Sequence, residues 1–81
     1  MQVKLLFFAQ LREAAKMSEQ VIALEYPVRV GEFVRGVLAS PEFEACRGLP
    51  LRYAMNDDFV GPDQWIEDKA VLALLPPVAG G

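Results

Sequence analysis

The 81-residue sequence contains no histidine and a single cysteine, Cys46. One cysteine cannot form an internal disulfide, so nothing in the composition indicates an oxidising compartment. Without histidine or a second cysteine, the chain lacks the ligands of structural zinc and iron–sulfur sites and the base of a Cys/His or Ser/His nucleophile. We therefore expect no metal site, no bound cofactor and no catalysis by side chains of this chain alone, and we interpret Cys46 as a small buried side chain.

Basic residues and long apolar runs are also scarce. The sequence has eight Lys and Arg residues and eleven Asp and Glu residues, which gives a net charge of −3. Nucleic-acid binding needs clustered positive charge, and anionic membrane surfaces also attract positively charged proteins. The apolar run Leu5 to Ala9 is shorter than the roughly 7–15 residues of a signal peptide core, and no stretch approaches the roughly 18 residues of a membrane span. The sequence predicts a cytoplasmic protein without nucleic-acid or membrane partners.

The hydrophobic pattern predicts one small domain, because so short a chain cannot fill a second core. Apolar and alternating runs predict strands at residues 2–10, 20–26, 53–56, 59–60 and 70–75. Residues 11–17 are expected to form a turn or one irregular helical turn. The main helix is predicted from an apolar stripe at helical spacing, formed by Val30, Phe33, Val34, Val37 and Leu38. Pro41 ends this helix, and residues 41–46 are expected to add a short extra turn.

This order of elements predicts an α+β fold in which one main helix packs across one face of a mixed sheet. The first and last strands are the longest apolar ones, so we place them at the centre, parallel to each other, as in the β-grasp topology. The predicted domain covers residues 1–75, and residues 76–81 form a C-terminal tail.

Both faces of the two central strands are apolar, although a single helix covers only one face. The helix is expected to cover the side that carries Leu5, Phe7, Leu72 and Leu74. A second set of apolar side chains then forms an uncovered face: Leu6, Phe8, Phe59, Ala73 and Leu75. A patch of this kind on a small protein usually marks an interface. The alternative is that the loop containing Trp65 and Ile66 folds over it; Trp65 is otherwise interpreted as a core or lid residue.

The tail is Pro76-Pro77-Val78-Ala79-Gly80-Gly81. Two prolines favour an extended conformation and prevent further sheet pairing, so the chain is expected to leave the fold pointing outward. Two glycines without side chains can enter a narrow channel in a partner. A free carboxylate becomes an acyl donor only after activation, for instance as a mixed anhydride with AMP. The tail therefore suits the delivery of one acyl group to other active sites, although a terminal Gly-Gly alone is weak evidence.

Three segments together resemble the small subunits of molybdopterin synthase, a family of ubiquitin-like sulfur carriers. They are Lys4 to Glu13, Ala54-Met55-Asn56, and Leu74 to Gly81. The resemblance extends from end to end, with the helix matching by pattern more than by identity. It implies a β-grasp fold and a C-terminal glycine, here Gly81 approached through Gly80, that an ATP-using activating enzyme adenylates and that then becomes a thiocarboxylate.

The resemblance also implies partners and contact residues. The tail would enter the large synthase subunit and donate sulfur to cyclic pyranopterin monophosphate, within a heterotetramer of two carriers and two large subunits. Contacts to the large subunit and the activating enzyme map to Phe8, Phe59 and Leu75, with Arg12 as an ion-pair partner. Tail residues Pro76, Pro77, Val78 and Ala79 complete the partner-binding set.

Two positions depart from the family pattern. Lys69 stands in the turn before the last strand where the family usually has glycine, which implies a different turn or a side chain at positive φ. Leu74-Leu75 replace the paired aromatic residues usual before Pro-Pro. Three alternatives remain open: a sulfur carrier for another pathway such as thiamine thiazole synthesis, a ubiquitin-like modifier of lysines, and a passive interaction domain.

Overall fold

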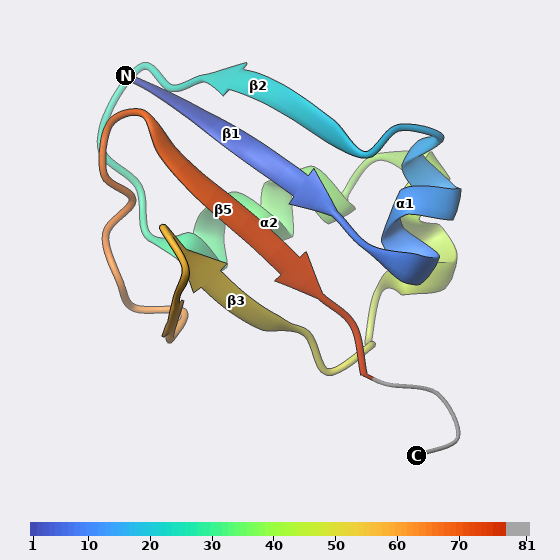
Figure 1. Cartoon of the computed structure of the whole chain (residues 1–81). Helices are drawn as coiled ribbons and strands as arrows, with labels where there is room; N and C mark the ends of the chain where they lie inside the picture. Colours follow the sequence, from blue (N-terminus) through green and yellow to red (C-terminus); the bar gives the residue numbers. More distant parts are fainter. Residues whose placement is uncertain (78–81) are drawn as a thin grey trace.

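The computed structural model describes residues 1–77 of the chain. Its five strands, two α-helices and one 3-10 helix follow one another as β1 (Gln2–Phe7), α1 (Ala9–Ala15), β2 (Glu19–Ala23), α2 (Val30–Leu38), η1 (Pro41–Cys46), β3 (Arg52–Met55), β4 (Asp58–Val60) and β5 (Ala70–Leu75). The strands form one sheet in the order β2-β1-β5-β3-β4. β1 and β5 are parallel neighbours, and every other pair is antiparallel. This is the predicted β-grasp arrangement, visible in Figure 1.

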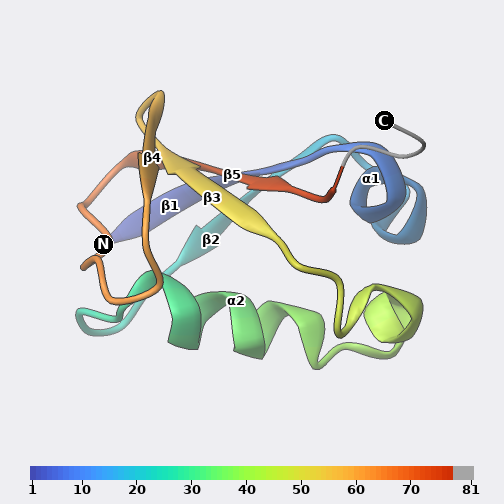
Figure 2. The same cartoon turned by 90° about the horizontal axis from the view of Figure 1, so that it is seen from below.

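The core lies between the sheet and α2, which crosses beneath it in Figure 2. Alternate residues of β1 point into this layer, and Val3, Leu5 and Phe7 are almost completely buried. Leu72 and Leu74 of β5 are also fully buried. Each large apolar side chain buried in this way contributes about 1.5–3 kcal/mol to the free energy of folding. The prediction that the helix covers the Leu5, Phe7, Leu72 and Leu74 side is confirmed.

The main helix and the short turn after it also agree with the sequence pattern. α2 spans Val30–Leu38 and buries Val30, Phe33 and Val34 of the predicted stripe. Residues 41–46 form η1, where Phe43 stacks on Phe7 with ring centroids 5.6 Å apart. Within residues 1–77, no helix has both the length and the apolar character needed to cross a bilayer.

Two predicted strands were too long. β1 ends at Phe7 rather than at residue 10, because the chain turns into α1: the Phe8 carbonyl accepts hydrogen bonds from the backbone N–H groups of Leu11 and Arg12. The turn places Leu11 in the core, fully buried. β2 ends at Ala23 rather than at residue 26, and Tyr26 is 71% exposed. Apolar runs mark buried strands, but they do not show where a chain leaves the sheet.

Asn56 connects the β3–β4 turn to the central strand. Asn56 and Asp57 both adopt positive φ, 51° and 73°, as a two-residue hairpin of type I′ requires. Asn56 then pairs twice with Val71 of β5: its backbone N–H donates to the Val71 carbonyl, and its side-chain Oδ1 accepts from the Val71 N–H, both at 2.9 Å. Asn56 thus shapes the turn and also holds the edge hairpin to the central strand.

Lys69 adopts a positive φ of 62°, so the second expectation for this position is confirmed. A left-handed conformation costs a non-glycine residue roughly 1–2 kcal/mol, and glycine avoids that cost but gains entropy in the unfolded chain. Replacing Lys69 by glycine should therefore raise the free energy of unfolding by about 0.5–1 kcal/mol. Urea unfolding measures this change. Lys69→Ala is the matched control, because it removes the same charge but keeps the unfavourable φ, and equal stabilisation by both variants would contradict the explanation.

Candidate functional site: an uncovered apolar face at the end of the central strands

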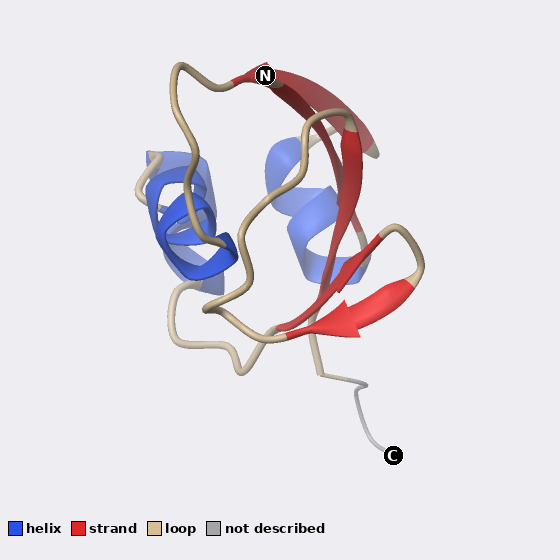
Figure 3. Ribbon diagram, turned by 90° about the vertical axis from the view of Figure 1, so that its left-hand side faces the viewer, coloured by secondary structure: helices blue, strands red, loops and turns tan. Residues whose placement is uncertain are grey.

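The predicted uncovered face exists in the structure. Figure 3 shows the helices to one side of the strands. On the other side, a row of side chains crosses four strands, because Leu6 pairs with Ala73, Ala73 with Ala54, and Ala54 with Phe59. Leu6, Ala54 and Ala73 are half-buried, whereas Phe59 is 61% exposed. Phe8, just past the end of β1, is 40% exposed.

The loop that could have covered this face packs elsewhere. Ile66 is buried in the core, and its N–H donates to the carbonyl of Val28 at 3.0 Å, beside the start of α2. Trp65 pairs with Arg29 in an isolated β-bridge, and the Arg29 guanidinium lies 4.7 Å from the Trp65 ring centroid. Trp65 remains half-exposed, so its interpretation as a core or lid residue was wrong. The loop thus leaves the uncovered face open.

The apolar face deepens into a hollow where β1 and β5 both end. The hollow has a volume of ≈ 650 Å³ and is lined by Phe8, Ala9, Gln10, Glu13, Arg52, Phe59, Leu75, Pro76 and Pro77. Because β1 and β5 run parallel, their carboxyl ends lie at the same edge of the sheet. The start of the tail therefore lies beside Phe8, although these residues are far apart in sequence. We call this site the Phe8–Phe59 hollow.

A strained turn presents Phe8 at the rim of the hollow. Phe8 is extended, with φ −125° and ψ 151°, and the next residue, Ala9, has a positive φ of 48°. A positive φ costs an alanine roughly 1–2 kcal/mol. Strain of this kind often occurs at binding sites, where the surrounding structure maintains it. Here it allows β1 to end and α1 to begin with Phe8 left on the uncovered face.

Arg52 gives the hollow a positive charge that sequence reasoning missed. Its guanidinium carbon lies 4.1 Å from the centroid of the Phe59 ring. The ion pairs within residues 1–77 are Lys4–Glu19 and Arg29–Asp63, so Arg52 pairs with no carboxylate in this part of the chain. Parity along β3 could have identified it, because Arg52 lies on the same face as Ala54. A cation held over an aromatic ring in an apolar surface is suited to forming an ion pair with a carboxylate of a partner.

Some of the other predicted site residues line the hollow and some do not. Leu75, Pro76 and Pro77 line the hollow together with Phe8 and Phe59. Arg12 is exposed on α1 but is not among the lining residues. The remaining predicted residues, Val78, Ala79, Gly80 and Gly81, lie outside the described residues.

The buried cysteine takes no part in the hollow. Cys46 is 3% exposed, and its Sγ lies 3.8 Å from the Gln10 carbonyl oxygen, which agrees with its interpretation as a small core residue. Residues 1–77 contain no cluster of three or more His, Cys, Asp or Glu side chains that could hold a metal ion. The described lining of the hollow carries one carboxylate, Glu13, and no serine, cysteine or histidine.

Comparisons with known proteins identify relatives of the chain by sequence. The ThiS family matches residues 5–81 of the chain. A curated relative from Chlamydomonas reinhardtii, the molybdopterin synthase sulfur carrier subunit, is 29% identical over 84 residues, covering all of both chains.

Solved structures share the fold. A putative molybdopterin converting factor subunit 1 from Pyrococcus furiosus superposes with a TM-score of 0.81 at 24% identity, covering 96% of this chain and 99% of the other. SAMP1 from Haloferax volcanii superposes with a TM-score of 0.83 at 20% identity over the full length of both. In a complex of subunits 1 and 2 of the molybdopterin-converting factor from Helicobacter pylori, the matched chain has a TM-score of 0.69 and 25% identity, again over the full length of both.

Proposed function

The chain belongs to the ThiS family, and from this premise we propose that it is the sulfur carrier that forms the small subunit of a molybdopterin synthase. The full-length match to a molybdopterin synthase sulfur carrier subunit supports the assignment, as does the likeness to a chain from a complex of the two subunits of a molybdopterin-converting factor. The observation that carries the proposal is the Phe8–Phe59 hollow, an exposed apolar site at the point where the tail begins.

The reactive group in this proposal is the carboxylate of Gly81. An oxygen of the carboxylate attacks the α-phosphorus of ATP on the activating enzyme, pyrophosphate leaves, and an acyl adenylate forms. A sulfide equivalent then attacks the acyl carbon and displaces AMP, which leaves a thiocarboxylate. Gly80 and Gly81 have no side chains, so they give both reactants close access to the acyl carbon. The chain binds no cofactor, and the ATP is consumed by the activating enzyme.

The folded domain provides the surface that the partner protein recognises. The large synthase subunit would pack on the uncovered face, with Phe8, Phe59 and Leu75 as apolar contacts and Arg12 and Arg52 as charged ones. Pro76 and Pro77, at the edge of the hollow, would direct Val78, Ala79 and the two glycines into the large subunit. There the sulfur passes to cyclic pyranopterin monophosphate, the acyl carbon–sulfur bond breaks, and water supplies the oxygen that restores the carboxylate. A heterotetramer would hold two carriers and two large subunits.

The uncovered face also suits the activating enzyme. Both partners would have to recognise the carrier near the base of the tail, because both act on the same terminal glycine. They would then bind one at a time, and sulfur loading and sulfur delivery would alternate. This shared use explains why a domain of 81 residues leaves large apolar side chains exposed on one face.

Intact-mass measurement tests the proposal. After incubation with an activating enzyme, ATP and a sulfide donor, the protein is expected to gain the mass of one oxygen-to-sulfur exchange. Adding the large subunit and cyclic pyranopterin monophosphate should return the mass to its starting value and produce molybdopterin. Loading without delivery to this pterin would point to a sulfur carrier of another pathway. Isopeptide adducts on lysines of other proteins would point to a modifier.

A further inference from the structure

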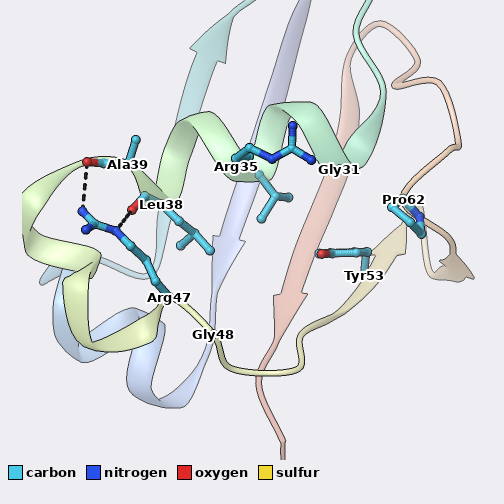
Figure 4. A pocket seen from close by; sticks show the side chains of 9 residues that line it. Gly31, Arg35, Leu38, Ala39, Arg47, Gly48, Tyr53 and Pro62 are labelled. Atoms are coloured by element: carbon cyan, nitrogen blue, oxygen red, sulfur yellow. Dashed lines mark hydrogen bonds between the residues drawn. The ribbon is translucent and has the colours of Figure 1, made fainter.

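A second concave site lies on the helix side of the sheet. It runs between α2 and the segment leading into β3, and Figure 4 shows it from close by. Its volume is ≈ 640 Å³, and it is lined by Gly31, Val34, Arg35, Leu38, Ala39, Arg47, Gly48, Tyr53 and Pro62. None of these residues lines the Phe8–Phe59 hollow. We call this site the α2–β3 groove.

Specific contacts fix both ends of the groove. At one end, the Gly31 N–H donates to the Pro62 carbonyl at 2.9 Å, and a Cβ on Gly31 would lie only 2.9 Å from the Pro62 Cβ. At the other end, Arg47 caps α2: its Nε donates to the Leu38 carbonyl at 2.6 Å and its Nη2 to the Ala39 carbonyl at 3.0 Å (Figure 4). These contacts hold the walls in place, so the groove is formed before any ligand binds.

The charge of the groove differs from that of the whole chain. The lining contains two of the eight basic residues and no aspartate or glutamate, in a protein of net charge −3. Arg47 is used in capping α2, but Arg35 is exposed and takes part in no salt bridge or hydrogen bond within residues 1–77. The half-buried Tyr53 forms no side-chain hydrogen bond in that part of the chain either. The half-buried Leu38 and the exposed Pro62 add apolar contact surface to the groove, whereas Val34 is almost completely buried in the core.

We propose that the α2–β3 groove binds an extended peptide segment of a partner protein in which a carboxylate lies between apolar side chains. The carboxylate accepts hydrogen bonds from the Arg35 guanidinium and the Tyr53 hydroxyl, and the apolar side chains contact Leu38 and Pro62. This proposal goes beyond sulfur transfer and does not depend on it. Because the groove and the uncovered face lie on opposite sides of the sheet, the carrier can hold such a segment while another protein occupies the uncovered face.

Backbone amide NMR tests the proposal with a defined probe, the peptide acetyl-Val-Leu-Asp-Val-Leu-amide. Titrating the full chain is expected to shift the signals of Gly31, Arg35, Gly48 and Tyr53 in a saturable manner. The same peptide with asparagine in place of aspartate should bind about three- to tenfold more weakly, because the charge-assisted hydrogen bonds become neutral ones. Arg35→Gln should weaken binding of the aspartate peptide by a similar factor. Unchanged signals elsewhere show that this variant is folded.

Arg52→Gln is the matched control, since it removes the same charge from the opposite side of the sheet. It should leave the affinity for the aspartate peptide unchanged. The proposal is overturned if the two peptides bind equally well, if Arg35→Gln has no effect, or if the shifts appear around Phe8 and Phe59 instead. The absence of any saturable shift up to about 5 mM peptide would overturn it as well. None of these outcomes bears on sulfur loading, which the mass measurement tests separately.

Discussion

Replacing Phe59 by aspartate is expected to weaken binding to the large synthase subunit by about 2–4 kcal/mol, roughly 30- to 1000-fold in Kd. Phe59 is the most exposed apolar side chain of the uncovered face, and Arg52 holds its ring in place by a cation–π contact of 4.1 Å. An aspartate there would place a charge against the apolar surface of the partner, where it would lose its hydration. Titration calorimetry of the purified subunits measures the change.

Because Phe59 is exposed, its loss should change the free energy of unfolding by no more than about 0.5–1 kcal/mol. Tyr26→Asp is the matched control: Tyr26 is 71% exposed, and it follows β2 at the far edge of the sheet. This variant should bind with unchanged affinity. If the Phe59 and Tyr26 variants bind equally well, the uncovered face is not the interface with the large subunit.

Replacing Gly81 by valine is expected to reduce sulfur loading by at least about 100-fold, to below detection. A β-branched side chain next to the acyl carbon hinders attack on ATP and on the adenylate, and small misplacements of reacting atoms are costly. The domain should fold normally, because the buried core residues of the described chain, from Val3 to Leu74, are all left unchanged. A time course of intact mass with the activating enzyme, ATP and a sulfide donor gives the loading rate.

Gly61→Val is the matched control for this experiment. A Cβ at Gly61 would meet no heavy atom within 4 Å, so the same substitution is tolerated there. It should load sulfur at the rate of the unchanged protein. Loading of the Gly81 variant at that same rate would show that the terminal residue need not be glycine, and the proposed chemistry would lose its main support.

Much of the fold could be predicted from the sequence because the strongest patterns coincide with the core. β5 was predicted with correct bounds because prolines follow it, and α2 coincides with the apolar stripe from Val30 to Leu38. The end of β1 was missed, because Phe8 continues the apolar run although the backbone turns at Ala9. Local hydrophobicity carries no information about a positive φ at an alanine.

The candidate site was predicted in part. Strand parity placed Phe8 and Leu75 on one face, Phe59 was expected to join them, and the structure brings all three together at the hollow. Parity along β3 could have placed Arg52 on this face, but its stacking over Phe59, seven residues away on the neighbouring strand, could not be foreseen. The α2–β3 groove could not be predicted either, because it depends on the contact between Gly31 and Pro62 and on the Arg47 cap. These contacts arise only from the tertiary arrangement.

Fragmentation mass spectrometry of the sulfur-loaded protein shows which segment of the chain carries the added mass. If the terminal carboxylate carries the sulfur, the oxygen-to-sulfur exchange is confined to the fragment that ends in Gly81, and it is lost when pterin and the large subunit are added. Fragment assignment matters, because oxidation of the exposed Met1 or Met17 adds an oxygen atom and nearly the same mass. A gain of a whole sulfur atom on the fragment containing Cys46, with the C-terminal fragment unchanged, would show that Gly81 is not the sulfur-carrying residue.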